Sequence, residues 1–174
     1  MKFQTAKELI EKAERDGYAV CAFCTWNAEI MNLVLKTAQE MNSPFMIMGG
    51  PSEFELLPPV QTAATANAIV QSYNVPVALH YDHGNSIEIL KECLDNGFTS
   101  VMLDLSKLSF KENVQGLKEA VELSKPFGAT VEGELGAVGR IDDGYREGGI
   151  ASKLALPFTT NDIDEQYAFI FTLL

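Results

Sequence analysis

Hydrophobic positions follow two alternating patterns along the chain. Short apolar runs predict buried strands, and longer segments with an apolar residue every three or four positions predict helices. The predicted strands cover residues 18–23, 45–48, 77–80, 99–104 and 129–134. The predicted helices begin near residues 5, 26, 60, 86 and 109, and a last helical stretch covers 162–174. Strictly alternating strands and helices are typical of an α/β fold with a parallel sheet.

Local signals mark several helix boundaries. Thr5 and Ser109 each precede a glutamate by three residues, which is the spacing of a capping box, and Gly17 and Gly97 are placed to end helices. The helix after residue 26 is expected to turn one apolar face inward, formed by Ile30, Leu33, Val34, Thr37 and Ala38. Residues 136–149 are rich in glycine and acidic residues, which predicts a long loop.

The pattern alone favours one kind of α/β fold. Five strand–helix units in 174 residues would complete a flavodoxin-like sandwich, whereas a closed (β/α)₈ barrel needs ~250 residues. A single α/β domain over residues 1–174 is expected in either case.

Charge and hydropathy narrow the classes of partner. The net charge of −11 disfavours nucleic acids and anionic membranes, which select a basic surface. A phosphorylated substrate is still compatible, because backbone N–H groups at glycine turns and helix N-termini can hold phosphate. No apolar run is long enough to span a bilayer, and the N-terminus reads as an amphipathic helix rather than a signal peptide. A soluble, cytoplasmic protein is the expectation.

Cys21 and Cys24 have the C-x-x-C spacing of redox and zinc motifs. Here Cys21 lies on the predicted strand of residues 18–23 and Cys24 directly follows it, so alternation along the strand places the two side chains on opposite faces. Free thiols are therefore expected.

Three successive strands end in carboxylates: Asp82, followed by His83, then Asp104, then Glu134. The C-terminal ends of parallel strands meet at one edge of the sheet, so these groups should converge. Imidazole and carboxylate ligands suit a divalent metal such as zinc, and an acid outside the ligand set is available for proton transfer. Helix N-capping is the alternative role for these acids.

Four segments resemble the class II, metal-dependent ketose-bisphosphate aldolases, a family that includes fructose- and tagatose-bisphosphate aldolases. The matching segments are His80–Gly84, Gly97–Ser106, Phe110–Asn113 and Val131–Gly136. The resemblance implies a TIM (β/α)₈ barrel in place of the sandwich, of which this chain carries about the first five units.

The resemblance also implies a role for each residue at the strand ends. His83 is similar to the family's first zinc ligand, and Asp82 to the acid that exchanges a proton with the aldehyde oxygen at C4. Asp104 and Glu134 are similar to carboxylates that hold a second or alternate metal position beside His83. The implied reaction is reversible aldol cleavage of a ketose (bis)phosphate to dihydroxyacetone phosphate and an aldehyde, with Zn²⁺ as Lewis acid. A second metal or a monovalent cation is a further candidate cofactor.

Other positions follow from the same resemblance. Asp142 or Asp143 is similar to the mobile-loop acid that transfers a proton at the enediolate, and Asn27 and Gly136 are candidates for substrate binding. His80 is expected to be a supporting group at the strand end. A Schiff-base aldolase is disfavoured, because no lysine lies on a predicted strand.

The family takes two further zinc histidines from later strands, and this chain has only His80 and His83. We therefore expect a truncated barrel. Two hypotheses are compatible with the sequence. The first is an aldolase subunit that acts on a sugar phosphate as a homodimer or larger oligomer. The second is a non-catalytic remnant that self-associates and binds metal or phosphate weakly.

Overall fold

The computed structural model describes residues 3–134, which form five strands and the helices that connect them. The strands are β1 (Cys21–Cys24), β2 (Phe45–Gly49), β3 (Val77–Gly84), β4 (Ser100–Leu103) and β5 (Thr130–Gly133). The helices are α1 (Ala6–Asp16), α2 (Ala28–Glu40), α3 (Pro51–Phe54), α4 (Pro59–Val70), α5 (Ile87–Asp95) and α6 (Phe110–Ser124), with a 3₁₀ turn η1 (Lys125–Phe127). The alternation expected from the hydrophobic pattern is confirmed.

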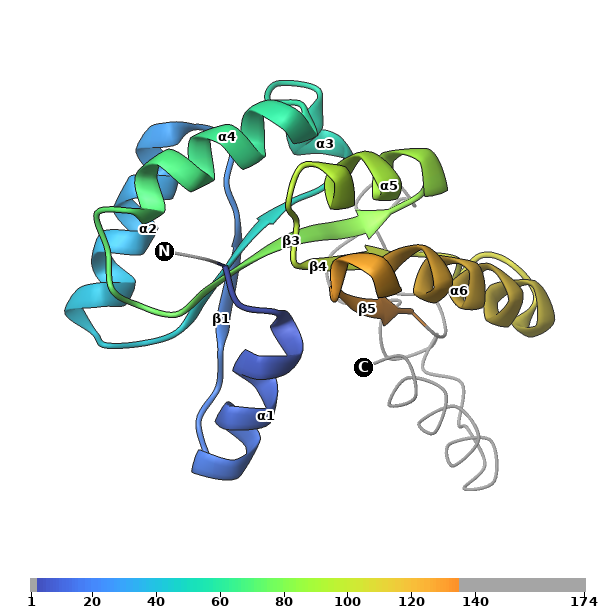
Figure 1. Ribbon diagram of the computed structural model, residues 1–174, viewed down its shortest axis with the longest axis horizontal. Helices are drawn as coiled ribbons and strands as arrows, with labels where there is room; N and C mark the ends of the chain where they lie inside the picture. The colour runs from blue at the N-terminus through green and yellow to red at the C-terminus, as the bar shows by residue number, and fades with distance from the viewer. Residues whose placement is uncertain (1–2, 135–174) are drawn as a thin grey trace, which may run out of the picture.

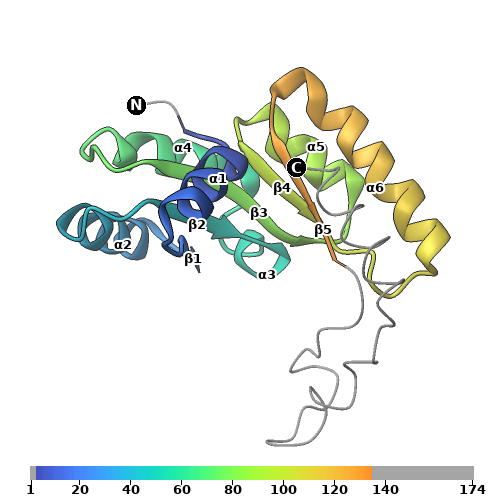
Figure 2. The same ribbon diagram turned by 90° about the horizontal axis from the view of Figure 1, so that it is seen from below.

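All five strands are parallel, and their order in the sheet is their order in the sequence. Figure 1 shows α2, α4, α5 and α6 following one another around one side of the sheet, and Figure 2 shows the same layering from below. A doubly wound sandwich instead reverses its strand order at a switch point and carries helices on both faces. The sandwich preferred from the pattern is therefore wrong, and the barrel-type winding is confirmed for the described units.

Side-chain alternation divides the sheet into a helix-covered face and an inner face. Along β3, Val77, Leu79 and Tyr81 belong to the hydrophobic core beneath the helices. His80 and Asp82 lie between these positions and therefore point to the inner face. The chemistry expected at the strand ends is thus carried on the side of the sheet that a barrel encloses.

The capping signals in the sequence mark real helix ends. The hydroxyl of Thr5 accepts a hydrogen bond from the backbone N–H of Glu8, and Gly17 closes α1 in a left-handed conformation with φ of 75°. The capping box expected at Ser109 likewise begins α6. These local interactions fix where α1 and α6 start relative to the strands.

The inward face expected for α2 is partly wrong. Met31, Leu35 and Ala38 are buried against the sheet, whereas Leu33 is 63% exposed. The apolar residues of α2 cover more than one face of the helix, so periodicity alone chose the wrong stripe. Tertiary packing against α4 and β2 decides which stripe is buried.

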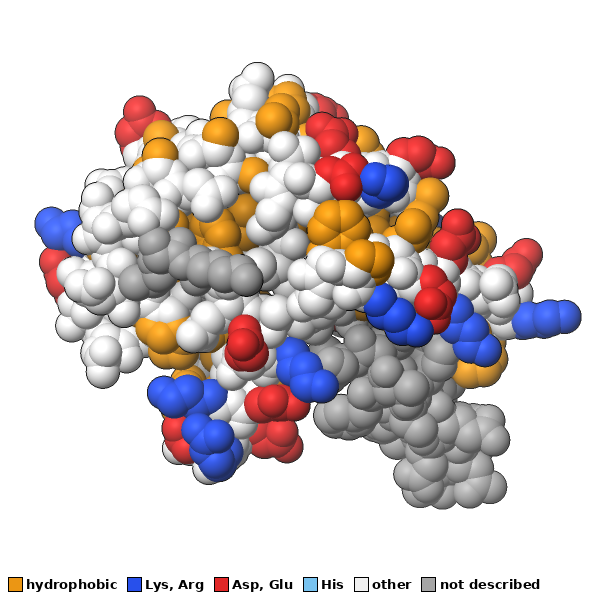
Figure 3. All heavy atoms as spheres, in the orientation of Figure 1, with side chains coloured by type: hydrophobic (Ala, Val, Ile, Leu, Met, Phe, Trp, Pro, Cys, Tyr) orange, Lys and Arg blue, Asp and Glu red, His pale blue; other side chains and the backbone are white. Residues whose placement is uncertain are grey.

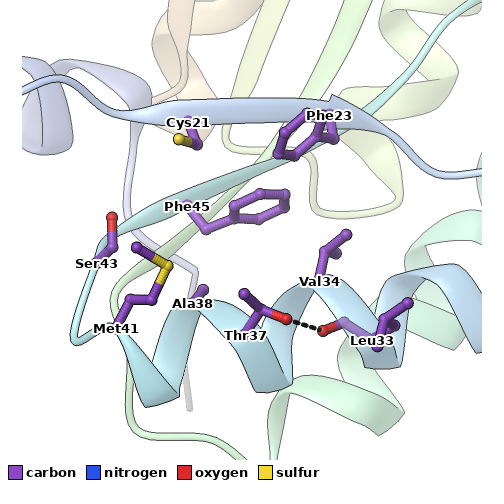
Figure 4. A pocket seen from close by; sticks show the side chains of 9 residues that line it. All are labelled: Cys21, Phe23, Leu33, Val34, Thr37, Ala38, Met41, Ser43 and Phe45. Carbon is purple, nitrogen blue, oxygen red and sulfur yellow. Dashed lines mark hydrogen bonds between the residues drawn. The ribbon is translucent and has the colours of Figure 1, made fainter.

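The remaining apolar stripe of α2 borders a groove beside β1, with a volume of about 260 Å³. Figure 4 shows Phe23 of β1 and Phe45 of β2 facing the helix across this groove, and their rings stack with centroids 5.8 Å apart. Met41 lies at one end and is 73% exposed. Because β1 is an edge strand among the described residues, this groove joins an open sheet edge to exposed apolar side chains.

The surface carries both signs of charge. On the face drawn in Figure 3, Lys and Arg side chains lie among acidic ones rather than in one continuous patch. Over the whole sequence, 24 acidic residues outnumber 13 basic ones. Among the described helices, none has the length and apolarity needed to cross a bilayer.

Candidate active site

His83 owes its position to an irregularity near the end of β3. The pairing of β3 with β4 shifts register between Tyr81 and Gly84, and His83 has a φ of 46°. A positive φ is uncommon for a residue with a side chain, and such outliers concentrate at functional sites. The bulge turns the imidazole toward the ends of β4 and β5, where two carboxylates lie.

His83, Asp104 and Glu134 converge, as the sequence predicted. The Nδ1 atom of His83 lies 3.3 Å from Oδ2 of Asp104 and 3.2 Å from Oε2 of Glu134. One ligand atom from each residue falls within a group no wider than 4.8 Å. Ligand atoms ~2.0–2.2 Å from a tetrahedral zinc ion lie roughly 3.3–3.6 Å apart. One imidazole and two carboxylates with these separations fit a divalent metal.

Further hydrogen bonds hold the Asp104 carboxylate and the backbone of Glu134. The backbone N–H and the hydroxyl of Ser106 donate to Oδ1 of Asp104 at 3.1 and 2.6 Å, on the oxygen opposite the one that faces His83. The side-chain amide of Asn113 donates to the backbone carbonyl of Glu134 at 2.9 Å and ties α6 to the end of β5. Partners of this kind hold metal-binding side chains in a productive orientation.

Asp82 lies between two neighbours on the inner face. Its Oδ2 accepts a hydrogen bond from the thiol of Cys24 at 3.8 Å, and its Oδ1 lies 4.0 Å from Nε2 of His80. Partial burial raises the pKa of Glu132 on β5, and the negative charge of Asp82 adds to that increase. Asp82 on β3 and Glu132 on β5 therefore add two carboxylates beside the group formed by His83, Asp104 and Glu134.

His80 is a buried and neutral part of this arrangement. Burial lowers its pKa to about 4, and the proximity of His83 adds to the decrease. Its Nδ1 atom pairs with the hydroxyl of Ser100 at 2.7 Å, and its Nε2 atom lies 3.8 Å from a carboxylate oxygen of Glu132. His80 thus connects β3, β4 and β5 beneath Asp82, in keeping with the supporting role expected for it.

The other residues predicted to belong to the site have different outcomes. The side-chain oxygen of Asn27 accepts a hydrogen bond from the N–H of Ile30 at 2.9 Å, so this residue caps α2, and its role in substrate binding stays a prediction. Gly136, Asp142 and Asp143 lie outside the described residues. Cys21 and Cys24 are free thiols, as expected.

Sequence reasoning missed three contributors to the site. Ser106 follows Asp104 by two residues. At this spacing an Asp side chain commonly accepts a hydrogen bond from the backbone N–H, so the contact could have been predicted from the sequence. The extension of β3 through Gly84 was signalled only by the glycine itself. The contact between Cys24 and Asp82 left no local signal, because it joins residues that are 58 positions apart.

The comparisons with known proteins agree with this geometry. The family model of the class II fructose-bisphosphate aldolases matches residues 4–169. The chain belongs to this family. Its expected resemblance to the class II aldolases is thereby confirmed.

Individual relatives lie within the same family. The chain is 37% identical over 139 residues to the D-tagatose-1,6-bisphosphate aldolase subunit GatY of Klebsiella oxytoca, a match that covers 80% of this chain and 49% of the relative. It is 34% identical to the YdjI aldolase of Escherichia coli K12, with a TM-score of 0.73 over 78% of this chain and 51% of that one.

A third match, to the fructose-bisphosphate aldolase of Campylobacter jejuni, has a TM-score of 0.79 over 99% of this chain and 55% of that one. Its 23% identity supports the fold alone. The chain therefore spans about half the length of the relatives that it matches.

Proposed function

We propose that this chain supplies the metal-binding and proton-transfer half of a class II aldolase that cleaves and forms ketose bisphosphates. The observation that carries the proposal is the convergence of His83, Asp104 and Glu134 at adjacent strand ends, with the Asp82 carboxylate beside them. Membership of the aldolase family and the similarity to a tagatose-bisphosphate aldolase subunit support the class of substrate.

Each residue has a defined task in this proposal. His83, Asp104 and Glu134 would hold a divalent metal, with zinc the expected ion, which supplies Lewis-acid polarisation of the ketose carbonyl. Asp82 accepts the proton of the C4 hydroxyl as the bond between C3 and C4 breaks, and returns it when the bond forms. The electron pair of the broken bond leaves an enediolate, which must then gain a proton at C3. Asp142 or Asp143 is the proposed donor of that proton.

The test separates metal binding from proton transfer. Zinc affinity is measured by calorimetry, and cleavage of fructose and tagatose 1,6-bisphosphates by a coupled assay, for the zinc-loaded chain. We expect His83→Ala to lower zinc affinity tenfold or more together with turnover. Asp82→Asn should keep the zinc affinity and lower kcat about 100-fold or more, because it removes only the proton acceptor.

Asp95→Asn is the matched control. Asp95 lies on the exposed side of α5, where its carboxylate forms an ion pair with Lys91 of the same helix. The control should change neither property. Equal zinc affinity in the wild-type chain and the His83→Ala variant would contradict the assigned metal site. Turnover that persists in a chelator would contradict metal dependence.

A second candidate function, a non-catalytic subunit that associates through its open sheet edge, rests on the groove beside β1. Phe23, Leu33 and Met41 are 55%, 63% and 73% exposed there, and exposed apolar patches next to unpaired strands favour association. Sedimentation measurements on the chain test this candidate. Leu33→Glu should reduce the associated fraction, whereas Leu56→Glu, at an equally exposed position outside the groove, should not.

A further inference from the structure

Cys24 ends β1 on the inner face of the sheet. The strand registers place it level with Met48 of β2, which in turn is level with His80 of β3. Asp82 follows His80 by two residues and therefore points to the same face. The Sγ atom of Cys24 consequently lies 3.8 Å from Oδ2 of Asp82, a contact between the first strand and the third.

A second carboxylate faces the same thiol. Glu53 of α3 is only 6% exposed, and its Oε2 atom accepts a hydrogen bond from the backbone N–H of Gly50 at 2.9 Å. Burial raises the pKa of Cys24 to about 12, and the charges of Glu53 and Asp82 contribute to the increase. The thiol therefore stays protonated at neutral pH, where it can donate a hydrogen bond but is a poor nucleophile.

The backbone at Gly50, after β2, is closely packed against the backbone of Asp82 on β3. A Cβ atom on Gly50 would lie 2.6 Å from the backbone carbonyl oxygen of Asp82, so the turn after β2 touches β3 at this point. The turn that carries Gly50 and Glu53 is thus packed against the backbone of Asp82.

We propose that Cys24 is a positioning residue for Asp82, whose thiol donates a hydrogen bond to Oδ2 and holds the carboxylate in the orientation that accepts the C4 hydroxyl proton. The inference rests on the proposed function, because it is there that Asp82 accepts a proton. Without the donor, the Asp82 carboxylate would lose one contact that restricts its rotamer, beside the negative charge of Glu132. Misplacing a reacting group by a fraction of an ångström slows the step that it serves and leaves other steps intact.

The two half-reactions of an aldolase make this distinction measurable. Exchange of a C3 hydrogen of dihydroxyacetone phosphate with solvent needs no C4 oxygen, whereas cleavage of the bisphosphate does. We expect Cys24→Ala to lower kcat for cleavage about 3- to 10-fold, with KM within about twofold and an unchanged rate of deuterium exchange into dihydroxyacetone phosphate. Cys24→Ser, which restores a donor, should recover most of the cleavage rate. A variant that loses both activities equally, or neither, overturns the positioning role.

A second measurement does not depend on turnover. Removing the negative charge with Asp82→Asn should ease ionisation of Cys24, so iodoacetamide should modify this residue about threefold faster at pH 9, as measured by peptide mass spectrometry. Cys21 lies on the same strand, is exposed and points to the opposite face, so its modification rate should not change. An unchanged rate at Cys24 overturns the proposed hydrogen bond. A wild-type chain with no cleavage and no exchange instead refutes the proposed function, while the modification experiment still decides whether Cys24 and Asp82 interact.

Discussion

Gly84→Ala is a test of how the fold places the metal ligands. Gly84 is the last residue of β3 and directly follows His83. A Cβ atom at this position would lie 2.2 Å from Cε1 of Tyr81 and 2.5 Å from the backbone oxygen of Met102. Neither neighbour can yield easily, because Tyr81 is completely buried and stacks on Phe54 with ring centroids 5.5 Å apart. The carbonyl of Met102 belongs to the backbone of β4.

The size of the effect follows from these two collisions. Overpacking a closely packed interior costs about 1–3 kcal/mol, and a clash with backbone belongs at the upper end of that range. We therefore expect Gly84→Ala to lower the free energy of unfolding by about 3 kcal/mol. For a chain of this size the melting temperature should fall by about 6–12 °C. The backbone N–H of Asp104 donates to the carbonyl of Gly84 at 2.7 Å, so a shift at Gly84 would move two of the proposed metal ligands, His83 and Asp104. Zinc affinity should fall about tenfold as well.

Thermal melts followed by circular dichroism, with and without zinc, measure both effects. Gly17→Asn is the matched control, because Gly17 has a positive φ but open space around its Cα, and asparagine tolerates that conformation. The control should melt within about 2 °C of the wild type. If Gly84→Ala also melts within that range and binds zinc equally well, then close packing at the end of β3 does not position His83.

Three further predictions concern stability. Between pH 6.5, the ordinary histidine pKa, and about pH 4, the unfolded chain takes up a proton at His80 that the folded chain excludes. The free energy of unfolding should therefore decrease as the pH falls through this range. Urea titrations should show a smaller decrease for the His80→Gln variant. Ser109→Ala removes the N-cap of α6 and should cost about 1 kcal/mol, seen as a melting temperature lower by about 2–4 °C. Zinc at about 100 times its dissociation constant should stabilise the wild-type chain by about 2.7 kcal/mol. Asp104→Asn should lose most of that gain at the same zinc concentration, whereas Asp95→Asn should keep it.

Local signals predicted the helix ends and the alternation of strands and helices better than they predicted the packing and the strand order. The capping box at Ser109 involves residues three positions apart, so its hydrogen bonds can be predicted from the local sequence. Leu35 of α2 is buried and Leu33 is exposed because of how α2 packs against β2 and α4. The spacing of apolar residues within the helix does not contain this information. The same limit explains the mistaken sandwich, because both α/β folds share one alternating pattern and differ in how successive units wind.

The candidate site shows the same division between local and distant information. His83 and Asp104 could be selected because a parallel sheet collects the residues at its strand ends on one edge. Their separation of 3.3 Å depends on the register shift between β3 and β4 and on the positive φ of His83. Neither feature follows from residue type alone. Gly84 was the one visible sign that the backbone comes close to its neighbours there.

The proposed function therefore makes metal binding and turnover separately measurable. His83, Asp104 and Glu134 come from three adjacent strands, and their spacing is set by the β3–β4–β5 registers and by α6 through Asn113. All of these elements lie within the described residues, so the proposed metal site draws its three side chains from this part of the sheet. Proton return at C3 depends on the proposed acid at position 142 or 143, outside that framework. We accordingly expect substitutions of His83, Asp104 or Glu134 to lower zinc affinity and turnover together. Asp142→Asn should keep zinc affinity, lose deuterium exchange into dihydroxyacetone phosphate, and so differ from Cys24→Ala in the half-reaction that it impairs.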